Sequence, residues 1–338
     1  MSRKGTDGFD VLGNILKAND GEPKQLINGE NVLMANNGTE FIAESDGQVS
    51  LHGNVINVFQ HYFVNGDVDF GVGNIDFNGN VTIKGMILSG FEVKASGDIL
   101  VIKGIESAGV SAGRDLKVNG GIIGDGKHLV KCGRNLFANH LQNAYIEAQG
   151  DVSIGNSCVQ SLVLCNGKVV LNNQKGAIVG GAVNALGGVE ARIIGTEFGT
   201  KTEITVGKDY LVQKTLNELM KAIDFHNANL QKIDKVLTPL LELVKKGMSL
   251  GCEKKEKLSL IIGKRKQIKK SITIMKSKFA EIEKLSSNVA LPFVKISGTV
   301  FPDVTVRIMV CTRQINDAQD HLMFFYNKKS DEIETGPL

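Results

Sequence analysis

An internal repeat constrains the fold more than any other feature of this sequence. Short segments that place a glycine and a small polar residue before an aliphatic residue recur, and successive aliphatic residues are 13, 18, 17, 20, 16, 17 and 20 positions apart. These residues are Val68, Val81, Ile99, Leu116, Leu136, Val152, Val169 and Val189. A unit this short cannot bury a core alone, so the repeat predicts a solenoid of stacked units.

Apolar residues alternate with polar ones inside each unit, which indicates β-strands. Four further apolar columns recur at fixed positions in the unit. The first comprises Phe70, Ile83, Val101, Val118, Ala138, Ile154, Leu171 and Ala191. The second comprises Ile75, Val93, Val110, Val130, Ile146, Val163 and Val183. The third is smaller, with Phe77, Ala95, Ala112, Cys132, Ala148, Cys165 and Ala185. The fourth comprises Ile105, Ile122, Leu141, Val159 and Ile178. We expect every column to face one core.

A right-handed parallel β-helix of about eight coils over residues 64–207 explains these columns. Equivalent residues of coils about 4.8 Å apart would stack directly on one another, with small residues beside a tight corner. A β-sandwich would not require small residues at one phase. The left-handed β-helix is built from strict hexapeptides, so the variable coil length favours the right-handed form.

A heptad pattern replaces the β pattern in residues 208–288. Heptad positions recur every seven residues from Leu216 and again from Leu258, on either side of a glycine-containing break at 246–251, and all of them are apolar except Arg265. The pattern predicts an antiparallel coiled-coil hairpin, in which Arg265 pairs with Asp234. The charge changes here as well: residues 208–285 hold 18 basic and 9 acidic residues, against 16 and 21 in residues 1–207.

The flanking segments show β patterns again. We expect residues 1–63 to form a β cap, with 39–43 and 47–51 as a strand pair, and residues 289–338 to return to the β-helix. The fold class is therefore mainly β with an α-helical hairpin.

Several ordered motifs resemble the bacterial flagellar assembly protein A (FapA) family. The first is a glycine and aspartate motif at Gly5, Asp7, Gly8, Asp10, Val11 and Gly13. Others lie at residues 66–69, 73–77, 93–99, 175–181 and 199–207. The resemblance covers nearly the whole chain and implies a non-enzymatic, cytoplasmic bacterial protein linked to flagellar assembly. Family members carry a further N-terminal domain ahead of the first motif, which the resemblance implies is lacking here.

A carbohydrate-active β-helix enzyme, or a polysaccharide-binding protein, is the alternative. Asp67, Asp98, Asp115 and Asp151 fall at one predicted corner, and clustered carboxylates can serve as acid and base. Asn80, Asn135, Lys168 and Gly188 occupy the same corner, as turn formation alone would predict. The chain has no tryptophan for sugar stacking. Turn formation is therefore the favoured role of these aspartates.

The second helix of the hairpin suggests a partner. Its candidate partner-docking residues, which give it a dense positive face, are Lys254, Lys255, Lys257, Lys264, Lys266, Lys269 and Lys270. A protein partner or self-association is favoured over a role of these lysines in solubility alone. Nucleic acid is disfavoured because no aromatic residues interleave with the lysines for base stacking. The spacing of the five cysteines and six histidines indicates neither a disulfide framework nor a metal site. We expect no cofactor, no small-molecule substrate and no membrane span, while a homo-oligomer stays open.

Overall fold

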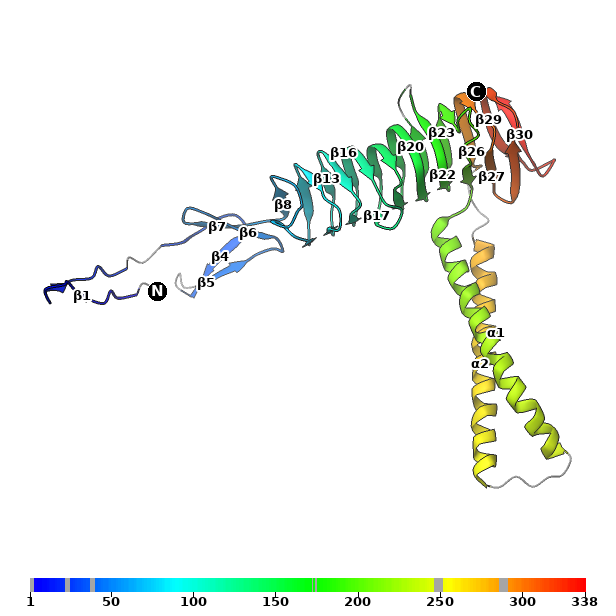
Figure 1. Ribbon diagram of the computed structural model, residues 1–338, viewed down its shortest axis with the longest axis horizontal. Coiled ribbons are helices and arrows are strands. Elements are labelled where there is room, and N and C mark those ends of the chain that lie inside the picture. Colours follow the sequence, from blue (N-terminus) through cyan, green and yellow to red (C-terminus); the bar gives the residue numbers. More distant parts are fainter. Residues whose placement is uncertain are drawn as a thin grey trace.

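The computed structural model describes residues 3–21, 25–36, 40–171, 173, 175–245, 252–285 and 291–338, without the side chains of 240, 243–245, 252–255 and 284–285. Figure 1 shows a long β-solenoid with a thin N-terminal extension at one end and two helices projecting from the other.

The elements follow the expected order along the chain. The N-terminal strands are β1 (Gly8–Phe9), β2 (Ile15–Leu16), β3 (Ile27–Asn28), β4 (Val32–Ala35), β5 (Glu40–Ala43), β6 (Gln48–His52) and β7 (Val55–Phe59). The first solenoid strands are β8 (His61–Val64), β9 (Ile75–Phe77), β10 (Asn80–Ile83), β11 (Met86–Ile87), β12 (Glu92–Ala95), β13 (Ile99–Val101), β14 (Gly104–Glu106), β15 (Gly109–Ala112) and β16 (Leu116–Ile123).

The later strands are longer in places. They are β17 (Leu129–Cys132), β18 (Leu136–Gln142), β19 (Tyr145–Ala148), β20 (Val152–Cys165), β21 (Lys168–Leu171), β22 (Ala177–Ala185), β23 (Gly188–Ala191), β24 (Ile193–Ile194) and β25 (Thr202–Val206). The two helices α1 (Tyr210–Lys245) and α2 (Cys252–Leu285) follow. The chain ends in β26 (Phe293–Val300), β27 (Val304–Ile308), β28 (Cys311–Ile315), β29 (Gln319–Asn327) and β30 (Glu332–Pro337).

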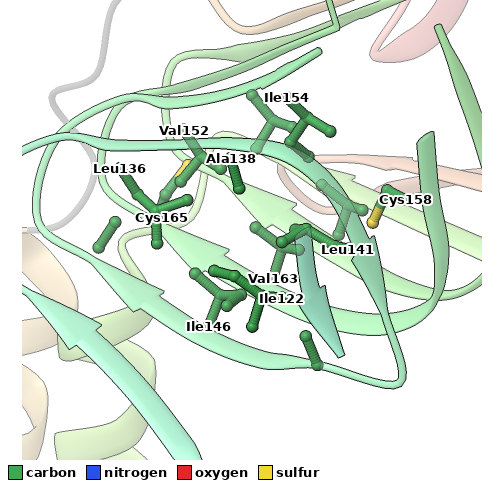
Figure 2. Close-up of a cluster of buried hydrophobic side chains, with 14 of the residues drawn as sticks. Ile122, Leu136, Ala138, Leu141, Ile146, Val152, Ile154, Cys158, Val163 and Cys165 are labelled. Carbon is green, nitrogen blue, oxygen red and sulfur yellow. The ribbon is translucent and has the colours of Figure 1, made fainter. Parts of the chain in front are cut away.

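Parallel pairing between successive coils confirms the predicted stacking. Val110 of β15, for example, lies in register between Val93 of β12 and Val130 of β17. The predicted columns point into one continuous core, in which most side chains are almost completely buried. Figure 2 shows how labelled members of this core, including Leu136, Ile146 and Val163, point toward one another inside the coils. The fold is therefore a parallel β-solenoid of about eight coils.

The first coil differs from the sequence alignment. Val81 stacks on Tyr62 of β8, whereas Val68 lies next to Ile87 in the following strand position. Phe70 is consequently 97% exposed, and its assignment to the core was wrong. The glycine and aspartate signal occurs here at a second corner of the coil, which is why the alignment gave a spacing of 13. With the register of the structure, the first coil is similar in length to the later ones.

A second correction concerns the fourth column. Cys158, not Val159, lies in register with Leu141 and Ile178 and is fully buried. The pairing between β18 and β20 shifts just after Ile154, where β20 contains an extra residue. Cys158 keeps the inward phase of Val152 and Ile154 and lies six residues after Val152, the same interval that separates Ile122 from Leu116 in an earlier coil.

The N-terminal strands form three small sheets outside the solenoid, β1 with β2, β4 with β5, and β3 with β7 and β6. The expected pairing of residues 39–43 with 47–51 was wrong, because β5 pairs with β4 and β6 pairs with β7. Gly53 has φ 60° and forms, with Asn54, a two-residue turn that joins β6 directly to β7. Among the described residues, none of these strands pairs with a solenoid strand.

The helices are an insertion at one solenoid corner. The coil leaves the sheet after Val206 and returns at Phe293, where β26 pairs in parallel with β23 and β27 with β25. Strands β28 and β29 then pair antiparallel with β27 and β26, and β30 pairs with β29. The predicted return to the β-helix is confirmed, and these antiparallel strands close its C-terminal end.

Candidate partner-docking site

The base of α1 is fixed to one face of the solenoid. Glu147 of β19 is only 2% exposed, although its side chain points outward, because α1 covers it. Its Oε1 accepts hydrogen bonds from Lys214 Nζ at 3.0 Å and from the Tyr145 hydroxyl at 2.8 Å. Burial, with the hydrogen bond to Glu147, raises the pKa of Tyr145 to about 12. A buried carboxylate held by a lysine and a tyrosine hydroxyl links helix to sheet.

The start of the helix has its own contacts. Asp209 is the N-cap, since its Oδ1 accepts hydrogen bonds from the backbone N–H groups of Leu211 and Val212. The Tyr210 N–H donates to Asn166 Oδ1 at 3.2 Å, and the Tyr210 side chain is 4% exposed. Burial raises the pKa of the Tyr210 hydroxyl. The Asp209 cap starts the helix, while the bond to Asn166 and the burial of Tyr210 hold that start against the solenoid.

The two helices meet along the predicted heptad seam. In α2 the seam residues from Leu258 to Ile282 are buried or half-buried, while almost all their neighbours are exposed. Apart from Tyr210 at its base, the buried side chains among the described residues of the hairpin are Leu216, Leu237 and Ile272. Arg265 Nε donates to Asp234 Oδ1 at 2.6 Å, so the predicted ion pair is confirmed. The seam fixes which sides of α2 face outward.

The candidate lysines lie on those outward sides. Lys257, Lys264, Lys266, Lys269 and Lys270 are all exposed. They occupy heptad positions b, e, f and g, so they are spread over both flanks and the back of α2 and do not form one face. None of these five forms an ion pair with another described residue. The side chains of Lys254 and Lys255 lie outside the described part of the structure.

The surrounding sequence strengthens this charge. Residues 257–280 contain eight basic residues and no acidic one. Arg265 alone among them is neutralised by a described residue, Asp234. The middle of α2 therefore presents seven positive charges to solvent along a fixed helix.

The aspartates of the solenoid corner have a structural role. Asp98 Oδ1 accepts the backbone N–H of Asp115 at 3.0 Å, and Asp151 Oδ1 accepts that of Lys168 at 2.7 Å. Asn80 and Asn135 make the same bond to the next coil. This row, which we call the corner ladder, runs Asn80, Asp98, Asp115, Asn135, Asp151, Lys168.

Arginines compensate the two adjacent acids of the corner ladder. Arg114 contacts Asp98 Oδ2 at 3.0 Å and Arg134 contacts Asp115 Oδ2 at 2.8 Å. Asp67 lies off the ladder, and its Oδ1 accepts the backbone N–H of Met86. The carboxylates are thus engaged in holding successive coils together.

Metal ligands and thiols are the other candidate groups in the part of the chain that the structure describes. No cluster of His, Cys, Asp or Glu suited to a metal ion occurs among these residues. Burial raises the pKa of the Cys132, Cys158 and Cys165 thiols to about 12, so they remain protonated and unreactive. Neither described helix is long and apolar enough to cross a membrane.

The anchor of α1 was not predicted from the sequence. Glu147 and Lys214 are 67 residues apart and belong to segments with different periodicities. The available signal was Glu147 itself, a charge directly beside the small inward residue Ala148 on a central strand.

Two family models match the chain. The β-solenoid domain of flagellar assembly protein A matches residues 60–333, and the N-terminal region of the same protein matches residues 2–54. The expectation that the family's N-terminal domain is lacking was therefore wrong. Searches of curated proteins and of solved structures found no match. Membership suggests a role in flagellar assembly, and with most of its length covered by these two models the chain belongs to the flagellar assembly protein A family.

Proposed function

We propose that this chain is a non-enzymatic structural adaptor of flagellar assembly in the bacterial cytoplasm. In this proposal the solenoid is a rigid scaffold, and the coiled-coil hairpin is an arm that docks an acidic protein partner. The observation that carries the proposal is the run of eight basic and no acidic residues at 257–280 on an exposed helix.

The charge distribution favours binding of a different protein over self-association of two coiled-coil hairpins. Seven positive side chains on α2 form no ion pair with another described residue, so two such hairpins would repel each other at close range. An acidic surface would be attracted over a distance of about 8 Å at physiological salt. The docking arm would therefore recognise negative charge first.

The way the hairpin is held supports a docking role. A flexible basic segment would lose conformational entropy when it binds, whereas the base of α1 is fixed to the solenoid by the contact of Lys214 with Glu147 and by the buried Tyr210. The Arg265 to Asp234 pair fixes the register of the two helices. A partner would thus meet a preformed surface.

The experiment reverses charge on α2 in the native bacterium. Lys264, Lys266, Lys269 and Lys270 are replaced together by Glu, and a tagged chain is purified with its bound proteins. We expect loss of the co-purifying partner and impaired flagellar assembly, because attraction becomes repulsion.

The matched control replaces the same four lysines by Arg, which preserves charge on exposed positions. Partner capture and flagellation should then survive. If the Glu variant, shown to be folded by circular dichroism, kept both, the docking proposal would be wrong. Turnover of a polysaccharide panel by the purified chain would instead support a carbohydrate-active enzyme.

A further inference from the structure

The N-terminal region leaves most of its large apolar side chains in solvent. Within residues 3–63, Val32 and Val58 are the buried hydrophobic residues of the described structure. Twelve others are more than a third exposed, namely Phe9, Val11, Leu12, Ile15, Leu16, Ile27, Leu33, Met34, Ile42, Val49, Leu51 and Phe63. Exposed apolar surface at this density marks an interaction site.

The outermost part of this region is an ordered hairpin, which we call the tip hairpin (residues 5–20). Asp10 Oδ1 accepts the backbone N–H groups of Leu12 and Asn14 and so closes the turn between β1 and β2. Further down, Asp7 Oδ1 accepts the N–H of Ala18, and Asp20 Oδ1 accepts that of Gly5. Asp7 and Asp10 of the sequence motif at Gly5 to Gly13 therefore stabilise the hairpin, and Gly5 is held by Asp20 outside the motif.

The end of the tip hairpin is apolar and acidic. Its five large side chains, Phe9, Val11, Leu12, Ile15 and Leu16, are each more than half exposed. Residues 7–16 contain two acidic residues and no basic one. A two-stranded ribbon of this size is at best marginally stable alone in water, so an apolar end without cover favours docking elsewhere.

A hollow of about 550 Å³ lies on the solenoid flank, which we call the flank groove. Its floor is low because Gly109 and Ser111 face outward from β15, between larger residues of the neighbouring coils. Phe91 and Leu129 form apolar walls. The exposed ring of Phe70 packs edge-on against Phe91, with ring centroids 5.2 Å apart.

The charge of the flank groove complements the tip hairpin. Lys94, Lys127 and Lys131 line it, together with one acid, Glu92, which pairs with Lys94 at 2.9 Å. Lys127 and Lys131 form no ion pair with another described residue. The groove thus offers apolar walls and positive charge to a tip with apolar side chains and negative charge.

We propose that the tip hairpin of one copy docks into the flank groove of a second copy. Figure 1 shows the tip hairpin at the end of the molecule, pointing away from its own solenoid, so its own groove is out of reach. Two copies meeting at their N-terminal ends would each place a tip hairpin beside the first coils of the other. A two-fold axis makes both contacts at once and closes the assembly as a dimer.

This dimer does not depend on the coiled-coil hairpin. The groove is formed by β12, β15 and β17 near the N-terminal end of the solenoid, whereas α1 and α2 project from the opposite end. Loss of partner docking by the coiled-coil hairpin would therefore leave the dimer intact. Loss of the dimer would likewise leave partner docking intact.

Sedimentation of the purified full chain over a range of concentrations tests the proposal. The expected species has twice the chain mass of 36.4 kDa. Leu12→Asp should weaken the dimer at least ~100-fold, because the symmetric assembly loses this side chain from both contacts. Gly109→Val should do the same by filling the groove, and a Cβ there meets only Glu92 Cγ at an ordinary 3.5 Å.

Phe198→Asp is the matched control, because Phe198 is 97% exposed near the other end of the solenoid and should leave the dimer unchanged. The contact itself is located by mixing a Val11→Cys chain with a Ser111→Cys chain, both lacking Cys252 and Cys311. We expect a disulfide between the two chains that neither forms alone. A chain that is monomeric at its highest soluble concentration, or a dimer insensitive to both Leu12→Asp and Gly109→Val, would overturn the proposal.

Discussion

At the corner ladder each coil is tied to the next through one side-chain oxygen. Asp98 and Asp151 use Oδ1 for this bond, and Asn80 and Asn135 use the equivalent amide oxygen. Because Asn performs the same task as Asp in one row, the ladder requires an acceptor and a short side chain, not a negative charge.

Replacing Asp98 and Asp151 together by Asn should therefore leave the fold and flagellar assembly unchanged. The free energy of unfolding should fall by less than ~1 kcal/mol, from the exposed pair of Asp98 with Arg114. The double Ala variant removes both acceptors and should lose ~0.5–1.5 kcal/mol for each. Urea unfolding measures both. A correctly folded Asn variant without biological function would point back to acid chemistry at this corner.

The small column leaves little space for larger side chains. Ala148 is fully buried and lies in register between Cys132 and Cys165. Ala148→Leu should overpack this corner and lower the free energy of unfolding by ~1–3 kcal/mol. Ser153→Leu is the control, since Ser153 faces outward between Phe137 and Val170 and should have a smaller effect. Equal melting temperatures for Ala148→Leu and the unmodified chain would refute the assignment.

Tyr145 should make stability depend on pH in alkaline solution. Its pKa is about 12 in the folded chain, raised by burial and by the hydrogen bond to Glu147, against about 10 in an unfolded one. Since the folded pKa is the higher, the neutral hydroxyl contributes stability that is fully present below about pH 10 and is lost as pH rises to about 12. Tyrosinate absorbance, with Tyr145→Phe subtracted, measures this titration. Ionisation of Tyr145 near pH 10 in the folded chain would contradict it.

At the scale of elements, the spacing of apolar residues predicted those features that depend on a regular repeat within one segment. The heptad phase, the Asp234 to Arg265 pair and the stacking of the coils after the first follow from spacing alone. The register of the first coil does not, because the glycine and aspartate signal occurs there at a second corner of the coil. Cys158 was missed although its spacing from Val152 matches that of the inward residues in earlier coils. The anchor at Glu147 and Lys214 is a contact between segments far apart in sequence, which no pattern within either segment encodes.

The ion pair of the hairpin can be measured by a double-mutant cycle in the full chain. Asp234→Asn and Arg265→Met are made singly and together, and unfolding is followed by the helical circular dichroism signal. Both side chains are about a third exposed, so we expect a coupling free energy of ~0–1 kcal/mol. The double variant should lose less free energy of unfolding than the two single variants lose in sum. Strict additivity would mean that the two side chains do not meet in solution.

At the scale of the whole molecule, the hairpin is separable from the core that supports it. The chain leaves β25 and re-enters β26 at one corner, where a Cβ on Gly207 would come within 2.7 Å of Pro292 Cγ. The ends of the insertion are therefore close together. The strands on either side, β25 and β26, are paired to β22 and β23 of the preceding coil, independently of the helices.

Replacing residues 209–290 by a short Gly-Ser linker should consequently preserve the solenoid. The linker closes a far shorter loop, and the main loss is the cover that α1 gives to Glu147 and Tyr145, which would become hydrated. We expect the helical circular dichroism signal to disappear while the β-sheet signal persists and unfolds cooperatively. Glu147→Gln, introduced into the shortened chain, should then have almost no effect on stability, whereas in the full chain it removes the buried carboxylate that holds Lys214. A shortened chain that failed to fold would show that the hairpin is part of the solenoid's stability, and that the two units cannot act as independent scaffold and arm.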